Sequence, residues 1–156
     1  IRNKLKQSLP AICFSGKFTK RNDASLVEHS GIICLDFDNF PSEKEMLEQK
    51  ETLTKDRYTY SVFISPSGLG LKALVKIPAE VDTHKQFFNS LQHHYDSEYF
   101  DISCKNVSRV CYESYDPLIY FNEQSSIFNQ VIEKEYQEVV KHKDVQTIPI
   151  TNESMD

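Results

Sequence analysis

The chain lacks any long hydrophobic run. No apolar stretch approaches the roughly 18 residues that a membrane-spanning helix requires, and the first residues lack the apolar core of a signal peptide. We therefore predict no membrane segment and expect a cytoplasmic location. The chain starts with Ile1 and not with Met, and it ends in the polar residues 151–156, so we expect a domain cut from a longer protein.

The four cysteines form no Cys-x-x-Cys pair. Cys34 lies inside an apolar run, and the set of Cys13, Cys34, Cys104 and Cys111 is typical of reduced packing residues. The adjacent histidines at 93–94 would diverge by about 100° on a helix and so would not face one ligand. The sequence therefore predicts no zinc site.

The chain also lacks an excess of positive charge. Its net charge of −5 argues against indiscriminate binding to nucleic acid, which depends on neutralisation of phosphates by Lys and Arg. The charges are unevenly distributed, because residues 43–51 are rich in acids that we expect on a solvated helix face. The start of the chain is basic and leaves a local basic surface open, through Arg2, Lys4, Lys6, Lys17, Lys20 and Arg21.

What is present indicates one folded domain. A chain of 156 residues can bury a substantial core, and 39% of the residues are hydrophobic, including 10 Phe and 8 Tyr. We predict a domain at residues 1–143 and a polar tail or linker at residues 144–156 that leads towards a missing C-terminal region.

Three helices are predicted from capping residues and apolar periodicity. The first runs from an N-cap at Ser42 to about residue 54, with Glu45 completing a capping box. The second runs from Asp82 or Thr83 to about residue 95, and a third, amphipathic helix covers residues 126–143. The inner faces of the first two helices are predicted to be Met46, Leu47 and Leu53, and Phe87, Phe88 and Leu91.

Strands are predicted between these helices from short alternating or apolar runs. Residues 65–70 are a turn, so the runs on either side of it form a hairpin. Strands flanked by helices, with at least one hairpin, favour an α+β fold over a doubly wound parallel sheet. The predicted strands cover residues 10–15, 31–39, 58–65, 71–77, 109–112 and 118–121.

The apolar run at residues 31–39 ends in two carboxylates one residue apart. Because side chains on a strand alternate between its faces, Asp36 and Asp38 project from the same face. Two like charges this close are costly unless compensated, and a divalent cation is the usual compensation. The pattern indicates a metal site or, equally, the polar mouth of a strand at which Asp38 and Asn39 open a turn.

Residues 65–72 form a loop that suits a phosphate. Glycines let backbone N–H groups converge on an anion, hydroxyls add donors, and a lysine adds a compact positive charge. The segment is no Walker A loop, because the Gly-Lys-Ser/Thr ending and the following helix are missing. An ordinary hairpin turn is the alternative. The candidate phosphate-binding residues are Ser65, Ser67, Gly68, Gly70 and Lys72.

Residues 101–112 offer a third carboxylate and an arginine. If Asp101 reaches the end of the strand that bears Asp36 and Asp38, three carboxylates can hold two divalent ions around a phosphoryl group. Arg109 then suits a bidentate grip on phosphate. The alternative for Arg109 is a structural ion pair with Asp116 or Glu113.

The order of these motifs resembles the archaeo-eukaryotic primase superfamily. The matching segments are Leu-Asp-Phe-Asp at 35–38, Ser-Pro-Ser-Gly-Leu-Gly-Leu-Lys at 65–72, and Asp101 followed by Ser-Arg-Val-Cys-Tyr at 108–112. The chain is most similar to the VirE N-terminal-type domains of bacterial mobile-element proteins, which often precede a helicase-like ATPase. The similarity covers residues 5–122, including the stretches 6–16 and 114–122.

The resemblance implies an RRM-like core, a mixed or antiparallel sheet flanked by helices. It makes Asp36 and Asp38 the paired ligands of Mg²⁺ or Mn²⁺, with Asp101 as the best match to the third acid and Asp116 as the second. The middle motif normally carries a histidine on the nucleotide's phosphates, and Lys72 stands there in this chain. Lysine can hold a phosphate but differs in shape, reach and pKa, so nucleotide binding can survive where polymerisation is lost.

Three functions follow from these patterns. The first is primer synthesis by two-metal nucleotidyl transfer on a single-stranded DNA template, in a mobile-element replication protein. The second is a catalytically inactive DNA- or nucleotide-binding module that serves a linked helicase. The third is a phosphatase of the haloacid-dehalogenase type, whose first motif also places Asp-x-Asp after an apolar strand, although its Gly-Thr continuation and its later Gly-Asp-x-x-x-Asp pattern are missing here.

Overall fold

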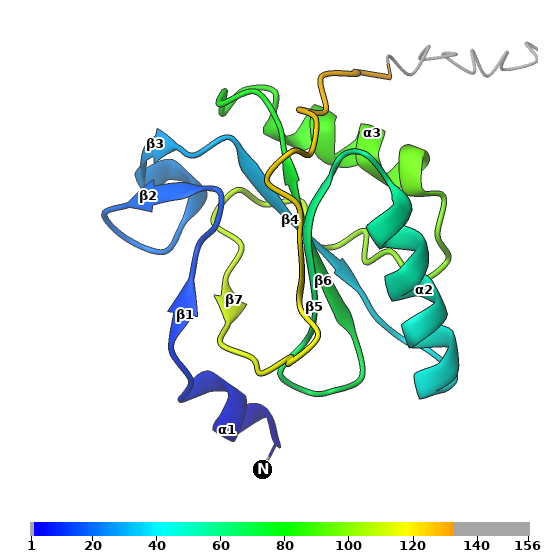
Figure 1. Ribbon diagram of the computed structural model, residues 1–156. Coiled ribbons are helices and arrows are strands. Elements are labelled where there is room, and N and C mark those ends of the chain that lie inside the picture. Colours follow the sequence, from blue (N-terminus) through cyan, green and yellow to red (C-terminus); the bar gives the residue numbers. More distant parts are fainter. Residues whose placement is uncertain (1, 133–156) are drawn as a thin grey trace, which may run out of the picture.

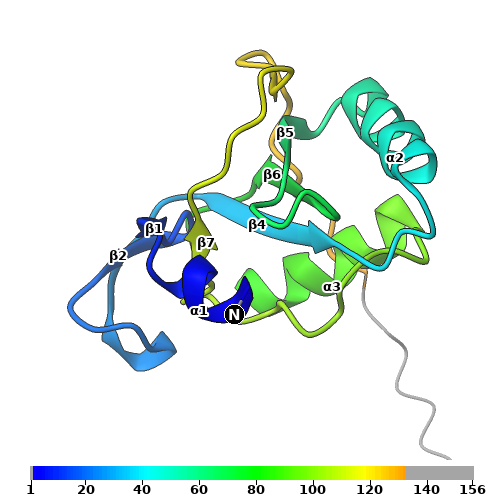
Figure 2. The same ribbon diagram turned by 90° about the horizontal axis from the view of Figure 1, so that it is seen from below.

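The computed structural model describes residues 2–132. Its helices are α1 (Arg2–Gln7), α2 (Glu43–Lys55) and α3 (His84–Tyr95), with a 3-10 turn at Asp23–Ser25. In Figure 1, α2 lies to the right of the central strands and α3 lies above and to their right, whereas α1 and the short strands near the N-terminus lie to the left. In Figure 2, α2 again lies to the right, and α3 runs below the central strands. The molecule therefore has a helical side and a side without long helices.

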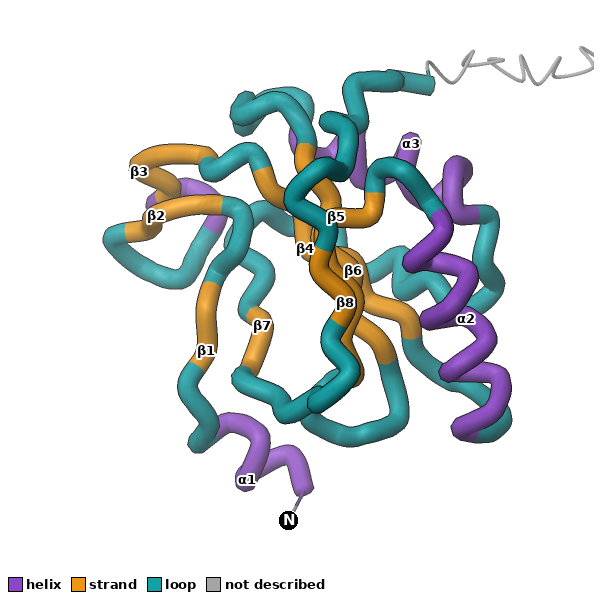
Figure 3. The backbone as a smooth tube through the Cα atoms, viewed as in Figure 1, coloured by secondary structure: helices purple, strands orange, loops and turns teal. Residues whose placement is uncertain are grey.

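The strands form three antiparallel sheets (Figure 3). The central sheet has the order β4-β6-β5-β8, and two small sheets pair β1 with β7 and β2 with β3. The predicted hairpin is confirmed, because β5 pairs antiparallel with β6 across the turn at residues 65–70. The strands are β1 (Ala11–Ile12), β2 (Gly16–Phe18), β3 (Leu26–His29), β4 (Ile32–Phe37), β5 (Thr59–Ile64), β6 (Leu71–Lys76), β7 (Cys111–Tyr112) and β8 (Tyr120–Phe121).

The central sheet has two unlike faces, which follow from the two-residue alternation of its strands. On β4, Ile33, Leu35 and Phe37 are buried in the large core that also contains Phe88 of α3. Cys34 joins a smaller cluster on the opposite side of the sheet. We call the first side the helix face and the second the open face, and alternation places Asp36 on the open face.

Helix α2 begins and ends close to the predicted positions. The hydroxyl of Ser42 accepts a hydrogen bond from the backbone N–H of Lys44 and donates to the Glu45 carboxylate, which confirms the N-cap and its pairing with Glu45. Met46 and Leu53 are buried as predicted. The prediction for Leu47 is wrong, because its side chain is 45% exposed, and Lys50 is buried on this helix instead.

Helix α3 carries the predicted apolar stripe. Phe87, Phe88 and Leu91 are all buried in the large core. Thr83 occupies the N-cap position, although its side chain makes no capping hydrogen bond. These aromatic and aliphatic side chains close the helix face of the sheet.

The prediction of a helix from residue 126 is wrong within the described part of the chain. Residues 126–132 run without helical structure, because their backbone donors bond to distant partners. Ser126 donates to the Arg57 carbonyl and Phe128 to the Lys76 carbonyl, and the N–H of Ile132 bonds to the Ser90 hydroxyl. The rest of that predicted helix, and the domain boundary at 143/144, lie outside the described residues.

The fold is α+β, as the sequence predicted. Within residues 2–132, the helices are too short or too polar to cross a membrane. All four cysteines are free thiols, three of them buried, which agrees with the predicted packing role.

Candidate functional site

The carboxylate of Asp36 lies between two cations on the open face. Asp36 is 3% exposed and pairs in register with Lys72 of β6. The distance from Lys72 Nζ to Asp36 Oδ1 is 2.5 Å, an ionic contact more than a well-directed hydrogen bond. Burial opposes the charge of Lys72, but Asp36 outweighs burial and raises the pKa of Lys72. Lys72 therefore remains charged at the floor of the site.

Arg109 is the second cation on Asp36. Its Nη2 atom lies 3.2 Å from Asp36 Oδ2, so the alternative ion pairs with Asp116 or Glu113 are not formed. Its Nε atom is buried and has no hydrogen-bond partner among residues 2–132. Arg109 thus holds Asp36 with one part of its guanidinium and keeps one donor unused.

Asp38 lies just beyond the end of β4. Its backbone N–H donates to the Tyr99 carbonyl, and its side chain is next to Gly70, where an added Cβ would lie 2.3 Å from Asp38 Oδ1. Burial and the nearby Asp36 charge raise the pKa of Asp38. Within the described chain this carboxylate accepts no hydrogen bond, so its oxygens remain available to a ligand.

Asp101 reaches the site through the backbone. Its N–H donates to the Asp36 carbonyl over 2.8 Å, and its carboxylate accepts bonds from the N–H and hydroxyl of Ser103. The Cys104 thiol lies 2.9 Å from Asp101 Oδ2 and 3.3 Å from Asp36 Oδ2. The structure therefore brings Asp101 together with Asp36 and places a thiol between them.

A polar cavity of about 190 Å³ opens beside these groups. Four of its lining residues are cationic and two are acidic, so its formal charge is positive. Six residues predicted from the sequence line it, whereas Asp101, Gly68 and Gly70 do not. The lining residues are Lys6, Arg21, Asp36, Asp38, Ser65, Ser67, Lys72, Arg109, Val110 and Tyr112. We call this hollow the acid–base cavity.

Comparison with known proteins assigns a family to this arrangement. A family model described as BT4734-like, N-terminal domain, matches residues 4–121. The chain belongs to this BT4734-like family. No curated protein and no solved structure matches the chain. The matched range contains every residue that lines the acid–base cavity.

The loop at residues 65–70 of this BT4734-like domain uses its backbone amides internally. Gly68 N–H donates to the Ser65 carbonyl and Leu69 N–H to the Ser67 hydroxyl. Gly68 adopts a φ of 73°, which favours glycine in this turn. The N–H groups of Gly68 and Leu69 are therefore already bonded within the turn, and the loop contributes the hydroxyls of Ser65 and Ser67 to the cavity.

Asp116, the second choice for the third acid, lies elsewhere. Its Oδ2 atom is 2.6 Å from Lys50 Nζ and accepts a hydrogen bond from Ile64 N–H, while Oδ1 accepts one from Leu118 N–H. These bonds lower the pKa of Asp116 against the effect of burial. Asp116 is thus a structural brace in this BT4734-like domain, and Asp101 is the acid that accompanies Asp36.

The donor set of the site fits a hard divalent cation. Carboxylate oxygens are the ligands that Mg²⁺ and Mn²⁺ prefer. Atoms of Asp36, Asp101 and Cys104 lie within 4.8 Å of one another. Burial raises the pKa of Cys104 and keeps it a neutral thiol, so Asp36 and Asp101 are the carboxylates of this cluster that could hold such an ion.

Sequence reasoning missed three members of the site. Lys6 comes from α1 and Arg21 from the loop before the 3-10 turn, and both line the acid–base cavity. The basic character of the first residues was the signal for these two. Cys104 had no such signal, because its contacts with Asp36 and Asp101 arise only from the fold.

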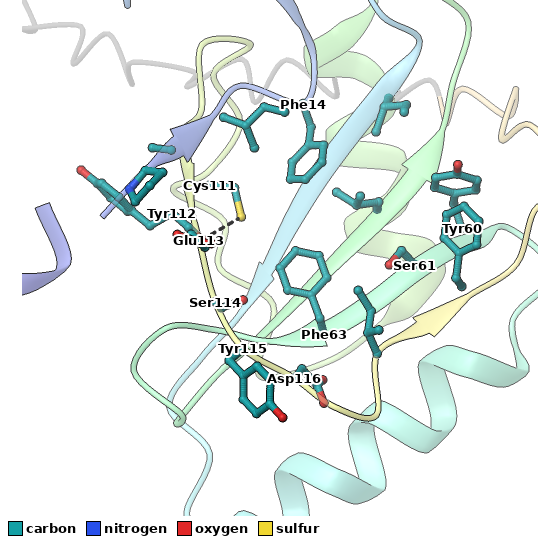
Figure 4. Close-up of a pocket in the computed structure, with 17 residues that line it drawn as sticks. Phe14, Tyr60, Ser61, Phe63, Cys111, Tyr112, Glu113, Ser114, Tyr115 and Asp116 are labelled. Carbon is teal, nitrogen blue, oxygen red and sulfur yellow. Dashed lines mark hydrogen bonds between the residues drawn. The ribbon is translucent and has the colours of Figure 1, made fainter. Parts of the chain in front are cut away.

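A second, larger hollow lies on the open face next to the cavity. This groove has a volume of about 830 Å³ and is mainly apolar, with several aromatic side chains around it (Figure 4). Tyr112 lines both the groove and the acid–base cavity. We call this second hollow the aromatic groove.

Proposed function

We propose that this domain is a primase-like module that binds the phosphates of a nucleotide or of a nucleic-acid strand in the acid–base cavity. The observation that carries the proposal is the convergence of Lys6, Arg21, Lys72 and Arg109 on one small polar hollow. These cations outnumber the two acids of the lining, so the cavity favours an anion. The spacing of a planar guanidinium and a compact ammonium suits phosphate oxygens.

Two of the cations have distinct roles in this proposal. Lys72 is held on Asp36 at 2.5 Å and sets the positive floor of the cavity. Arg109 shares Asp36 but keeps a buried Nε donor without a partner, and a buried donor left unpaired is costly. A phosphate oxygen in the cavity would satisfy that donor, while Ser65 and Ser67 add hydroxyl donors to the lining.

Binding of tripolyphosphate and of ATP by isothermal titration calorimetry, with and without Mg²⁺, tests this function. Arg21 is exposed, so Arg21→Gln should keep the fold and weaken binding by about threefold to tenfold. Lys72→Met should weaken it by about tenfold or more. Lys55→Gln on α2, far from the cavity and paired only with Glu51, is the matched control. No binding by the wild type, or equal affinity in all four proteins, would refute the proposal.

Metal-dependent nucleotidyl transfer is the second candidate, and the meeting of Asp36 and Asp101 favours it. Mg²⁺ or Mn²⁺ held by Asp36, Asp38 and Asp101 would supply charge neutralisation at a triphosphate and activation of a 3′-hydroxyl. Lys72 in place of the histidine that the primase resemblance implies favours binding without turnover. We therefore place phosphate binding first and catalysis second.

Incubation of the domain with single-stranded template, labelled nucleotides and Mn²⁺ separates these two candidates. Products that vanish in Asp38→Asn would establish transfer and reject the binding-only function. Asp38 is preferred over Asp36 for this test because, among residues 2–132, it forms no ion pair whose loss would disturb the fold. A linked or separate helicase-like ATPase remains the partner that we propose for either activity.

The phosphatase alternative receives no support from this fold. It requires regular alternation of strands and helices around a parallel sheet, and the strand pairs found within residues 2–132 are antiparallel.

A further inference from the structure

The aromatic groove is an unusually large apolar hollow for one face of a small domain. Its volume of about 830 Å³ compares with about 190 Å³ for the acid–base cavity, and it falls in the range of roughly 300–1,000 Å³ typical of ligand sites. Tyr115 is 87% exposed and Phe121 53% exposed at its edge. Such exposure of aromatic side chains around one hollow marks a binding surface. The six aromatic lining residues are Phe14, Tyr60, Phe63, Tyr112, Tyr115 and Phe121.

These aromatic side chains come from strands and loops that are far apart in sequence. Figure 4 shows Phe63 and Tyr60 over the central sheet, with Phe14 on one side of the hollow and Tyr115 near its other end. The rings of Tyr60 and Phe121 pack edge to face with centroids 4.6 Å apart. The groove is therefore a lined surface of several rings and not one isolated aromatic residue.

Two lysines that do not line the groove lie over two of its aromatic rings. Lys72 and Lys76 project from the same side of β6 as Leu74, which lines the groove, and four residues of strand separate them by about 13 Å. Lys76 Nζ lies 4.8 Å from the centre of the Tyr60 ring, and Lys6 Nζ lies 5.7 Å from the centre of the Tyr112 ring. Of the two acids in the lining, Asp116 is neutralised by Lys50.

We propose that the aromatic groove binds the unpaired bases of a single nucleic-acid strand whose backbone continues into the acid–base cavity. Aromatic rings bind bases of any sequence by stacking, and flanking cations follow the phosphates. Tyr112 joins the two hollows, so bases in the groove and phosphates in the cavity can belong to one strand. The inference rests on the proposed function in one respect only, the assignment of phosphates to the cavity.

The two lysines over the rings favour a nucleic-acid strand over an apolar peptide as the occupant. A peptide would gain nothing from Lys6 and Lys76 unless it were acidic, whereas every nucleotide carries a phosphate beside its base. The size of the groove relative to the cavity distinguishes a strand from a mononucleotide, because one base would fill only part of a hollow of about 830 Å³.

Fluorescence anisotropy with a short oligo(dT) and an abasic strand of the same length tests the proposal. The two strands share their phosphates and differ in bases alone. We expect wild type to bind oligo(dT) about tenfold or more tightly than the abasic strand, since stacking contributes about 1–3 kcal/mol per base. The variant Tyr115→Ser/Phe121→Ser should lose that preference. Both side chains are exposed, and Leu47→Ser on the helical side is the matched control for loss of an exposed apolar group.

The possible outcomes test the proposal for the aromatic groove separately from the proposed function of the acid–base cavity. Equal affinity of wild type for the two strands would overturn the proposal for the groove, even if tripolyphosphate binds. Binding of thymidine triphosphate as tight as that of oligo(dT) would overturn the claim of a strand. A retained preference for oligo(dT), in a protein that fails to bind tripolyphosphate, would uphold the groove and refute the proposed function of the cavity.

Discussion

The helix face and the open face of the central sheet are made by the same strands but have opposite character. Along β6, Leu71, Ala73 and Val75 are fully buried under the helices, whereas Lys72 and Lys76 alternate with Leu74 on the other side. The helix face is closed by apolar side chains from α2 and α3. The open face holds the ion pairs of Asp36 with Lys72 and Arg109, together with the aromatic groove. Substitutions on the first should change stability, and substitutions on the second should change ligand binding.

The largest expected difference between the faces comes from two phenylalanines. Phe37 is fully buried on the helix face and contacts Phe100 and Tyr95 edge to face, so Phe37→Ala should lower the free energy of unfolding by about 3–5 kcal/mol. Phe121→Ala in the aromatic groove should lower it by less than about 1 kcal/mol. Urea unfolding followed by circular dichroism measures both. Similar decreases in the free energy of unfolding of the two variants would show that the two faces do not differ in their contribution to stability.

The ion pair of Asp36 and Lys72 should be the exception on the open face, because its loss should change stability. Asp36→Asn leaves Lys72, whose side chain is 9% exposed, beside a neutral group. Removal of one partner of a buried ion pair costs about 3 kcal/mol or more. The double variant Asp36→Leu/Lys72→Leu should lose less stability than the sum of the single variants. Strict additivity in this double-mutant cycle would show that the two charges do not interact.

The junction between α3 and the β2–β3 hairpin should respond to pH. The ring of His84 is buried and lies 3.0 Å from the ring of His29, and burial followed by the His29 charge lowers the pKa of His84 from 6.5 to about 4. Between these values the unfolded chain takes up a proton that folded His84 does not. Stability is therefore present above pH 6.5 and is lost as the pH falls towards 4, by up to about 3 kcal/mol.

Urea unfolding of wild type and His84→Gln at several pH values measures this effect. The variant lacks the titrating ring, so its stability should depend less steeply on pH in this window. His29, Asp23 and Lys85 face His84 and remain in both proteins. Burial also lowers the pKa of His29, so the variant should keep a smaller pH dependence that comes from His29. Parallel pH profiles would show that His84 does not contribute.

The smallest expected effects come from two glycines of one turn. Gly68→Ala meets no atom within 4 Å but must adopt a φ of 73°, which should cost about 1 kcal/mol without changing ligand affinity. In Gly70→Ala the new methyl group would lie 2.3 Å from Asp38 Oδ1. It should displace that carboxylate and weaken the Mg²⁺-dependent part of binding at the acid–base cavity. Calorimetry with tripolyphosphate and Mg²⁺ compares the two variants, and equal affinities would show that Asp38 takes no part in ligand binding.

Local sequence patterns correctly predicted the parts of the fold that depend on residues close together in the sequence. The apolar run at residues 31–39 predicted the buried strand β4, and the turn residues at 65–70 predicted the β5–β6 hairpin. The capping pair of Ser42 and Glu45 predicted the start of α2. Each of these features depends on residues a few positions apart.

Features that depend on contacts between residues far apart in the sequence could not be predicted from local patterns. Lys50 is buried on α2 because Asp116, 66 residues away, and the Leu118 carbonyl neutralise it. Phe128 is buried among Tyr58, Phe87 and His94, and this packing overrides the helical periodicity of its segment.

The candidate site also has parts that local motifs predict and parts that they do not. Short motifs with charged side chains pointed to Asp36, Asp38, Lys72 and Arg109. Lys6 and Arg21 look like ordinary surface charges until the N-terminal segment is placed beside β4. The aromatic groove has no sequence motif, since its rings come from five separate segments of the chain.

The Asp116 carboxylate bonds at once to Lys50 of α2, Ile64 of β5 and the N–H of Leu118. The segment that forms one wall of the aromatic groove is thereby fastened to the rigid body of the domain. A ligand that enters the groove need not order this wall, so less conformational entropy is lost on binding. The groove is thus preorganised by the ion pair between Asp116 and Lys50, a cation on α2.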